Sequence, residues 1–165
     1  MSIAYLNIGT NLGHRLSNID RTVALLSAIP GIGDLTVSQP VTSEPWGFDS
    51  DNTFVNVGVR LDTTLTPLQL LDATQMVERT MSPASHRDDN GNYRDRLIDI
   101  DIIAFTMDDG NDLVTTSTRL TIPHPLMHLR EFVLIPMSQL APEWKHPLMH
   151  LTAPQLLEAL RGHCC

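Results

Sequence analysis

Residues 94–105 carry the sequence Arg-Asp-Arg-Leu-Ile-Asp-Ile-Asp-Ile-Ile-Ala-Phe. From Ile98 onward this run is rich in β-branched and apolar residues, which predicts a strand. Side chains alternate across a strand, so Ile98, Ile100 and Ile102 should share one face while Asp99 and Asp101 share the other. The stretch therefore predicts a strand with one apolar face and one acidic face.

The two aspartates are candidate metal ligands. Two carboxylates on one face repel each other unless a cation lies between them, and Mg²⁺ favours oxygen ligands that water and substrate phosphates complete. Arg94 and Arg96 lie just upstream, where guanidinium groups could bind phosphates through paired hydrogen bonds. The alternative is an edge strand with a solvated acidic face. Because arginines flank the pair, we favour a metal and phosphate site.

The composition narrows the class of protein. The chain has 165 residues, of which 42% are hydrophobic and 18% charged, and we expect one globular domain over residues 1–165. The net charge of −8 argues against nucleic acid or an anionic membrane as a partner. A polyanion would need a local positive pocket, which five central arginines could build: Arg87, Arg94, Arg96, Arg119 and Arg130.

Other features indicate a cytoplasmic location. Cys164 and Cys165 are adjacent in sequence, which disfavours a disulfide and is consistent with a reducing compartment. The first residues do not have the pattern of a secretory signal, and no apolar run approaches the length of a membrane span. The sequence does not specify the oligomeric state, and we expect a monomer.

Hydrophobic periodicity predicts further strands and helices. We expect strands at residues 3–8, 34–42 and 54–61, and helices at residues 16–26, 66–80 and 152–162. The glycine-rich turn at residues 9–13 lacks the Gly-Lys-Ser/Thr ending of a P-loop, so we reject that motif. Strands and helices alternate irregularly, with a hairpin around residues 34–62, which predicts an α+β fold with a mixed or antiparallel sheet.

The strand at residues 54–61 has an unusual second face. Its valines share one side, whereas Phe54 and Asn56 lie on the other. A ring beside an amide suits a flat heterocycle, although an ordinary half-exposed strand is the alternative. The preceding loop, residues 43–48, is a candidate binding loop, and the polar loop at residues 82–93 is a candidate lid.

One short segment occurs twice. Residues 124–129 and 146–151 both have the sequence His-Pro-Leu-Met-His-Leu. Histidines four residues apart on a helix can bind zinc, so a structural zinc domain is one hypothesis. Neither copy lies within a long helical pattern, and the unit is shorter than any structural repeat, which disfavours that hypothesis.

Taken in order, these motifs resemble the 6-hydroxymethyl-7,8-dihydropterin pyrophosphokinase family of folate biosynthesis. The signature is Arg-Leu-Ile-Asp-Ile-Asp-Ile at residues 96–102, which resembles the family's Arg-x-x-Asp-x-Asp-Ile. Supporting segments lie at residues 8–13, 44–47, 54–56, 120–125 and 130–134. The resemblance implies a ferredoxin-like core in an α/β/α sandwich. It also implies Mg²⁺-dependent transfer of pyrophosphate from ATP to the hydroxymethyl pterin, with release of AMP.

The resemblance assigns roles to particular residues. Two Mg²⁺ ions would be held by Asp99 and Asp101, and Arg96 of the signature would be a catalytic arginine. Arg87 and Arg94 are further candidate catalytic arginines, although the resemblance itself does not assign them. The pterin-binding residues would be Ser43, Glu44, Pro45, Trp46, Phe54, Asn56 and Phe132, with the ring stacked between the two phenylalanines. The ATP contacts would be Gln75, Glu78, Arg96, Ile102, Arg119, Thr121, His124 and Arg130.

The chain departs from the family pattern in one loop. Residues 82–85 are Ser-Pro-Ala-Ser, where the family usually has Gly-Arg-x-Arg. His86, Arg87 or Arg94 could supply the missing charge from other positions. An active enzyme is our leading hypothesis, and a non-catalytic relative that binds pterin or nucleotide is the alternative.

Overall fold

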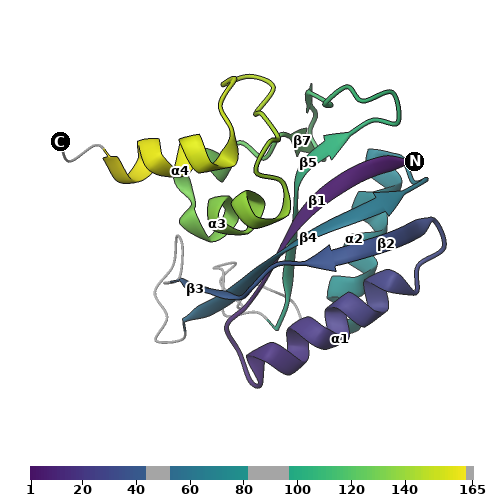
Figure 1. Ribbon diagram of the computed structural model, residues 1–165. Helices are drawn as coiled ribbons and strands as arrows, with labels where there is room; N and C mark the ends of the chain where they lie inside the picture. Colours follow the sequence, from purple (N-terminus) through teal and green to yellow (C-terminus); the bar gives the residue numbers. More distant parts are fainter. Residues whose placement is uncertain (44–52, 82–96, 163–165) are drawn as a thin grey trace.

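The computed structural model describes residues 1–43, 53–81 and 97–162. A sheet with the strand order β2-β4-β1-β5 forms its centre, and β3 pairs with β4 beside this path (Figure 1). The strands are β1 (Ser2–Thr10), β2 (Ile32–Val37), β3 (Val41–Ser43), β4 (Phe54–Thr63) and β5 (Asp99–Thr106). Every one of these strand pairs is antiparallel, which confirms the predicted α+β class with an antiparallel sheet.

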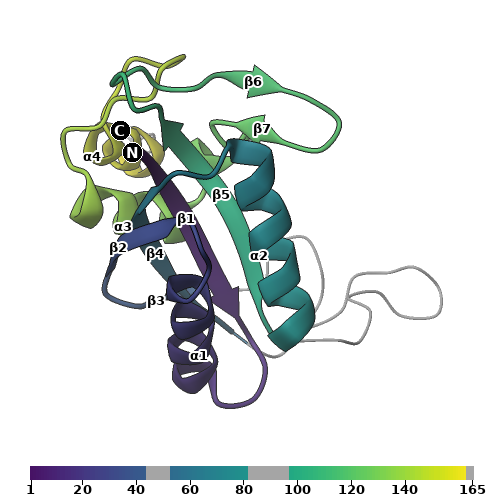
Figure 2. The ribbon, with the colours of Figure 1, turned by 90° about the vertical axis from the view of Figure 1, so that its right-hand side faces the viewer.

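Helices α1 (Arg15–Ser27) and α2 (Pro67–Met81) cover one face of the sheet (Figure 2). Apolar residues of the central strands point to this side, among them Leu6, Ile8, Val57, Ile100 and Ile102. They pack against buried residues of the two helices, including Leu26 and Leu70. The isoleucines of β5 are buried, as strand alternation predicted.

Helices α3 (Glu131–Leu140) and α4 (Ala153–Arg161) pack on the other face, together with a 3-10 turn at Met127–Leu129. A β-bulge in β5 contributes to this contact. Tyr5 pairs with Ala104 and Leu6 with Ile102, which leaves Ile103 without a partner in the register. Ile103 and Ala104 therefore both join the cluster with α3 and α4.

The predicted strand at residues 34–42 is wrong in one respect, because the structure has two strands there. β2 ends at Val37, and β3 begins at Val41, after Pro40. Proline has no N–H for a strand ladder, so a break at this point is expected on physical grounds. The other predicted strands and helices lie within a few residues of those observed. Thr66 and Thr152 form reciprocal hydrogen bonds with Gln69 and Gln155 at the helix starts.

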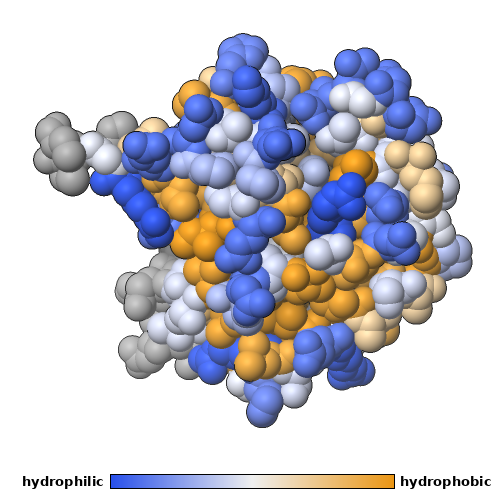
Figure 3. All heavy atoms as spheres, in the orientation of Figure 1, coloured by the Kyte–Doolittle hydropathy of each residue, from blue (hydrophilic) through white to orange (hydrophobic). Residues whose placement is uncertain are grey.

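A short hairpin follows the main sheet. Strands β6 (Thr115–Thr116) and β7 (Thr121–Ile122) pair with each other. None of the described helices is long and apolar enough to cross a membrane. Apolar and hydrophilic areas alternate on the face shown in Figure 3, and exposed apolar surface of this kind is common in folded proteins, so it assigns no partner.

We predict that Gly58→Ala destabilises the protein by about 1–3 kcal/mol, the usual cost of overpacking. An added Cβ would lie 2.6 Å from Cβ of Pro136 and 3.0 Å from Cδ1 of Leu140, so α3 would have to move off β4. Urea unfolding measures the change. Gly33→Ala is the matched control, because its nearest neighbour is the flexible end of Met1 at 3.2 Å. Equal losses in the two variants would contradict the prediction.

Candidate functional site

Two rows of residues cross the middle of the sheet on the face away from α1 and α2. The register pairs Asn56 with Gly9 and Gly9 with Asp99. The next row on this face pairs Gly58 with Asn7 and Asn7 with Asp101. Paired residues point to the same face, so the two aspartates lie on the same side as Asn56.

The acidic face of β5 meets a positive charge from the start of α3. Arg130 is the N-cap residue of this helix, and its guanidinium Nη1 lies 3.9 Å from Oδ2 of Asp101. The side chain of Arg130 is only 13% exposed, compared with 32% for Asp101. Burial lowers the pKa of Arg130, whereas Asp101 and Asp99 raise it. β5 is the last strand in the described sheet order, yet its acidic face is not simply exposed to solvent, because Arg130 lies beside Asp101.

Glu78 reaches the same strand from α2. Its Oε2 accepts a hydrogen bond of 2.9 Å from the backbone N–H of Ile100, the residue between the two aspartates. Backbone groups on the open side of an edge strand need such partners. Gln75 lies one turn earlier on α2 and is half-buried. The contact with Ile100 was not apparent from the sequence, because helix periodicity does not show which strand a helix contacts.

Phe54, Asn56 and Ser43 come together where β3 pairs with β4. Ser43 pairs with Phe54, and Nδ2 of Asn56 donates to Oγ of Ser43 at 2.8 Å. Asn56 is 3% exposed. A Cβ on Gly9 would lie 2.7 Å from Oδ1 of Asn56 and 3.4 Å from Cδ1 of Phe54. Only a glycine allows both groups to lie over β1, a role that sequence reasoning missed.

Phe132 lies in the first turn of α3, next to the acidic face. The guanidinium carbon of Arg130 is 5.6 Å from the centroid of the Phe132 ring. The carbonyl oxygen of Phe132 accepts a 2.8 Å hydrogen bond from Nδ2 of Asn7. The start of α3 is thus tied both to the centre of the sheet and, through Arg130, to Asp101.

Other residues with an expected role are distributed around this centre. His124 follows β7, which contains Thr121, and its backbone N–H donates to the carbonyl oxygen of Ile103 at 2.9 Å. Arg119 is exposed and forms a 2.5 Å ion pair with Asp72 of α2, rather than with the aspartates of β5. Ile102 is 4% exposed, and its side chain is part of the core.

Several expected site residues lie outside the described part of the chain: Glu44, Pro45, Trp46, His86, Arg87, Arg94, Arg96, Cys164 and Cys165. The candidate lid at residues 82–93 also lies there.

The two histidine repeats form similar turns. In each, Nδ1 of the first histidine accepts a hydrogen bond from the backbone N–H two residues later: Leu126 to His124 at 3.1 Å and Leu148 to His146 at 3.2 Å. Both repeats line a cavity of about 240 Å³. Among the described residues, no three His, Cys, Asp or Glu side chains are grouped so that they could hold a metal ion. The first histidine of each repeat therefore has a local structural role, and the zinc hypothesis gains no support.

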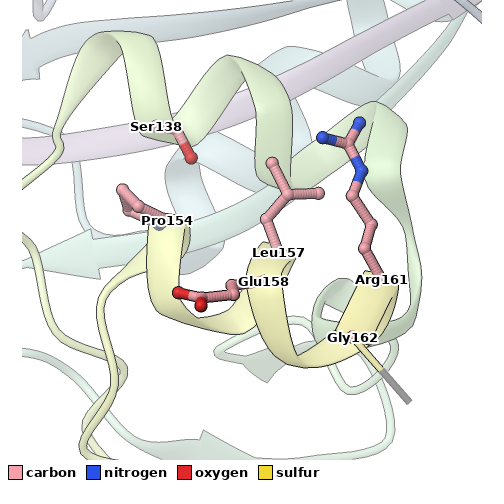
Figure 4. A pocket seen from close by; sticks show the side chains of 6 residues that line it. All are labelled: Ser138, Pro154, Leu157, Glu158, Arg161 and Gly162. Atoms are coloured by element: carbon pink, nitrogen blue, oxygen red, sulfur yellow. The ribbon is translucent and has the colours of Figure 1, made fainter. Parts of the chain in front are cut away.

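A different cavity, of about 440 Å³, lies between α3 and α4 (Figure 4). Ser138 of α3 and Pro154, Leu157 and Arg161 of α4 line it. Arg161 also forms an ion pair with Glu131. None of its lining residues belongs to the acidic face, so this cavity is not part of the candidate site.

Known proteins resemble this chain in both sequence and fold. Residues 5–142 match the family model of 7,8-dihydro-6-hydroxymethylpterin-pyrophosphokinase (HPPK). A Porphyromonas gingivalis relative named 2-amino-4-hydroxy-6-hydroxymethyldihydropteridine pyrophosphokinase is 39% identical over 147 residues, which cover 89% of this chain and 95% of the relative. The folic acid synthesis protein fol1 of Schizosaccharomyces pombe is 34% identical over 96% of this chain, but only 20% of its own length is matched.

Solved structures show the same fold. A crystal structure of HPPK-DHPS in complex with substrates matches with a TM-score of 0.70 at 14% identity, covering 96% of this chain and 45% of that one. HPPK-DHPS of Plasmodium falciparum matches with a TM-score of 0.61 at 16% identity, covering 99% of this chain and 44% of that one. Sequence and fold thus place the chain among the pyrophosphokinases. It belongs to the 7,8-dihydro-6-hydroxymethylpterin-pyrophosphokinase family.

We predict that the imidazole of His124 titrates near pH 4 in the folded protein. Burial, and to a smaller extent the charge of Arg130, lower its pKa from 6.5 to about 4, and Asp99 opposes them. An NMR titration of the imidazole signals measures this value. A midpoint near 6.5 would contradict the prediction.

The same shift predicts how stability depends on pH. Between about pH 4 and 6.5 the unfolded chain binds a proton at His124 that the folded protein does not, so the free energy of unfolding rises with pH in this window. Urea unfolding at several pH values should show a smaller slope for His124→Asn. His14→Asn, which changes a histidine at an exposed position, is the control.

We predict that Glu78→Ala destabilises the protein by about 1 kcal/mol and Glu78→Gln by less, because glutamine keeps an acceptor for the N–H of Ile100. Urea unfolding without ligands provides the measurement. An equal loss in both variants would show that the charge of Glu78, rather than this hydrogen bond, is what stabilises β5.

Proposed function

We propose that this protein transfers pyrophosphate from ATP to the hydroxymethyl group of 6-hydroxymethyl-7,8-dihydropterin, with release of AMP, as a step of folate biosynthesis. The family assignment supports the reaction. The observation that carries the proposal is the pair Asp99 and Asp101, which share one face of β5 with the guanidinium of Arg130 beside them.

The donor set at β5 fits Mg²⁺. Two half-exposed carboxylates on adjacent positions of one face supply hard oxygen ligands, and phosphate oxygens and water would complete them. We infer that Asp99 and Asp101 hold two Mg²⁺ ions. When bound, these ions neutralise the charge of the triphosphate.

The pterin would stack between Phe54 and Phe132, beside Asn56. Because Nδ2 of Asn56 donates to Ser43, its Oδ1 is oriented over Gly9, on the face of the aspartates. An oxygen in this place can accept hydrogen bonds from N–H groups at the edge of a pterin. The backbone of residues 43–46, including Glu44, Pro45 and Trp46, would contribute the other contacts.

The nucleotide would lie along β5 and the segment that follows β7. We propose contacts from Gln75, Glu78, Arg96, Ile102, Arg119, Thr121, His124 and Arg130. Nδ1 of His124 already accepts a backbone hydrogen bond, so Nε2 of the neutral ring carries the proton and can donate to an oxygen of ATP. Arg87, Arg94 and Arg96 would bind the phosphates.

In the reaction, the hydroxymethyl oxygen attacks the β-phosphorus of ATP. A new P–O bond forms, the bond from the β-phosphorus to the oxygen of AMP breaks, and the hydroxyl proton leaves to solvent. The protein contributes mainly by holding the two substrates in line and by placing charge around the phosphates.

The strand order supports a finer description of the fold. β1-α1-β2 and β4-α2-β5 are each a strand, helix and strand with one antiparallel strand between their two strands. This arrangement is the split βαβ unit of ferredoxin-like folds, which we propose for the core, in an α/β/α sandwich. A single domain over residues 1–165, a monomer, a cytoplasmic location and the lack of nucleic-acid partners stay predictions.

An active enzyme should form AMP only when ATP, Mg²⁺ and the pterin are all present. We predict that Asp99→Asn and Asp101→Asn each lower kcat by at least about a hundredfold, because charge neutralisation dominates phosphoryl transfer. Asp20→Asn, on the exposed side of α1, is the control. A variant of β5 that keeps nearly the wild-type rate would show that the pair holds no essential metal.

The second candidate is a non-catalytic relative that binds pterin or nucleotide. Its support is the sequence Ser-Pro-Ala-Ser at residues 82–85, in place of Gly-Arg-x-Arg. Calorimetry with a non-hydrolysable ATP analogue and the pterin separates the candidates, since binding without AMP formation at high protein concentration would favour this one.

A further inference from the structure

Asn7 is a buried polar residue in the middle of the sheet. It lies in β1 between Gly58 of β4 and Asp101 of β5, and it is 4% exposed. An amide in such a place destabilises the fold unless it is hydrogen-bonded. Its Nδ2 donates to the carbonyl oxygen of Phe132 at 2.8 Å.

The carbonyl oxygen of Phe132 needs this partner because of Pro136. Pro136 lies inside α3, four residues after Phe132. In an α-helix the carbonyl of a residue receives its hydrogen bond from the N–H four positions later, and proline has no N–H. Asn7 therefore supplies from the sheet the donor that the helix itself lacks.

Gly58 accommodates the other consequence of the same proline. Pro136 packs so close to β4 that a Cβ at Gly58 would lie 2.6 Å from its Cβ. Gly58 and Asn7 are neighbours in the register. Two adjacent positions of the sheet are thus adapted to α3. Gly58 leaves room for Pro136, and Asn7 donates a hydrogen bond to the carbonyl oxygen of Phe132.

The first turn of α3 carries two groups that the acidic face uses. Arg130, the N-cap residue, extends to within 3.9 Å of Asp101, and the ring of Phe132 lies beneath its guanidinium. If this turn moved away from the sheet or rotated about the helix axis, both groups would shift relative to the aspartates and to Phe54.

We propose that Asn7 is a positioning residue for pterin binding: by bonding the carbonyl that Pro136 leaves without a helical donor, it holds Phe132 in place to stack on the pterin. Asn7 itself touches no substrate. The inference rests on the proposed function, because it assigns the ligand of Phe132.

The first test compares Asn7→Ala with wild type in the pterin pyrophosphokinase assay. The expected result is a rise of about fivefold in KM for the pterin, the factor that corresponds to one ordinary hydrogen bond. At saturating substrates kcat should change by less than about twofold, because the groups around the phosphates are kept. If Asn7→Ala does not fold, Asn7→Ser, which is too short to reach Phe132, takes its place.

Thr22→Val is the matched control. Thr22 is fully buried, and its Oγ1 donates to the carbonyl oxygen of Asn18 at 2.7 Å within α1, on the opposite face of the sheet. The Thr22→Val variant also loses one hydrogen bond to a backbone carbonyl, so it should lower stability without changing KM for the pterin. If Asn7→Ala lowers stability like Thr22→Val and leaves KM for the pterin unchanged, the proposal is overturned.

The second test is a double-mutant cycle with Pro136→Ala, measured by urea unfolding without any substrate. Alanine restores the missing N–H and keeps the Cβ that packs on Gly58, so Asn7→Ala should have a clearly smaller effect on stability in this background. Equal effects in both backgrounds would refute the link between Asn7 and Pro136. An inactive wild type would refute the proposed function instead, and calorimetry of pterin binding by wild type and Asn7→Ala would then still test the role of Asn7.

Discussion

The register of β1 between β4 and β5 is the constraint on which the rest of the structure depends. Asn7 and Gly9 pair with Asp101 and Asp99 on one side and with Gly58 and Asn56 on the other. Because side chains alternate with a period of two, a slip of one residue would turn the aspartates into the core and the isoleucines out of it. Burial of the isoleucines against α1 and α2 therefore also determines where the carboxylates point.

On the face of the sheet away from α1 and α2, the packing of α3 depends on one proline. Pro136 removes a hydrogen bond from α3 and brings a bulky ring close to β4, which would weaken an isolated helix. On the sheet both effects are compensated, since Gly58 makes room for the ring and Asn7 bonds the carbonyl of Phe132. The helix therefore has one favoured position, and Arg130 at its N-cap is held beside Asp101.

The charges of the site differ from those of the whole chain. The protein carries a net charge of −8, yet Arg130, the N-cap residue of α3, lies 3.9 Å from Asp101 and has little exposure. Burial and the positive charge of Arg130 lower the pKa of His124 to about 4, so its ring is expected to be uncharged at neutral pH. A polyanion together with its cations could be held here, because both signs of charge lie within one small region.

Some features of this protein follow from the sequence alone, since they are local. Strand alternation in residues 98–102 placed isoleucines and aspartates on opposite faces, and the motif order indicated the family. Capping boxes at Thr66 and Thr152 marked two helix starts. These predictions depend only on neighbours in the chain, whose geometry is nearly the same in any fold.

Other features were decided only by tertiary structure, because they join residues far apart in sequence. Helix periodicity indicated neither that Glu78 accepts a hydrogen bond from the backbone N–H of Ile100 nor that Arg119 pairs with Asp72. Asn7 looked like an ordinary polar residue of a strand, and Gly9 like part of a turn. Each acquires its role from a neighbour in another strand or helix: Asn7 from Phe132, 125 residues away, and Gly9 from Asn56 and Phe54 across the sheet. The sequence determined the faces of the strands, whereas the packing of α3 on the sheet decided which of these residues meet.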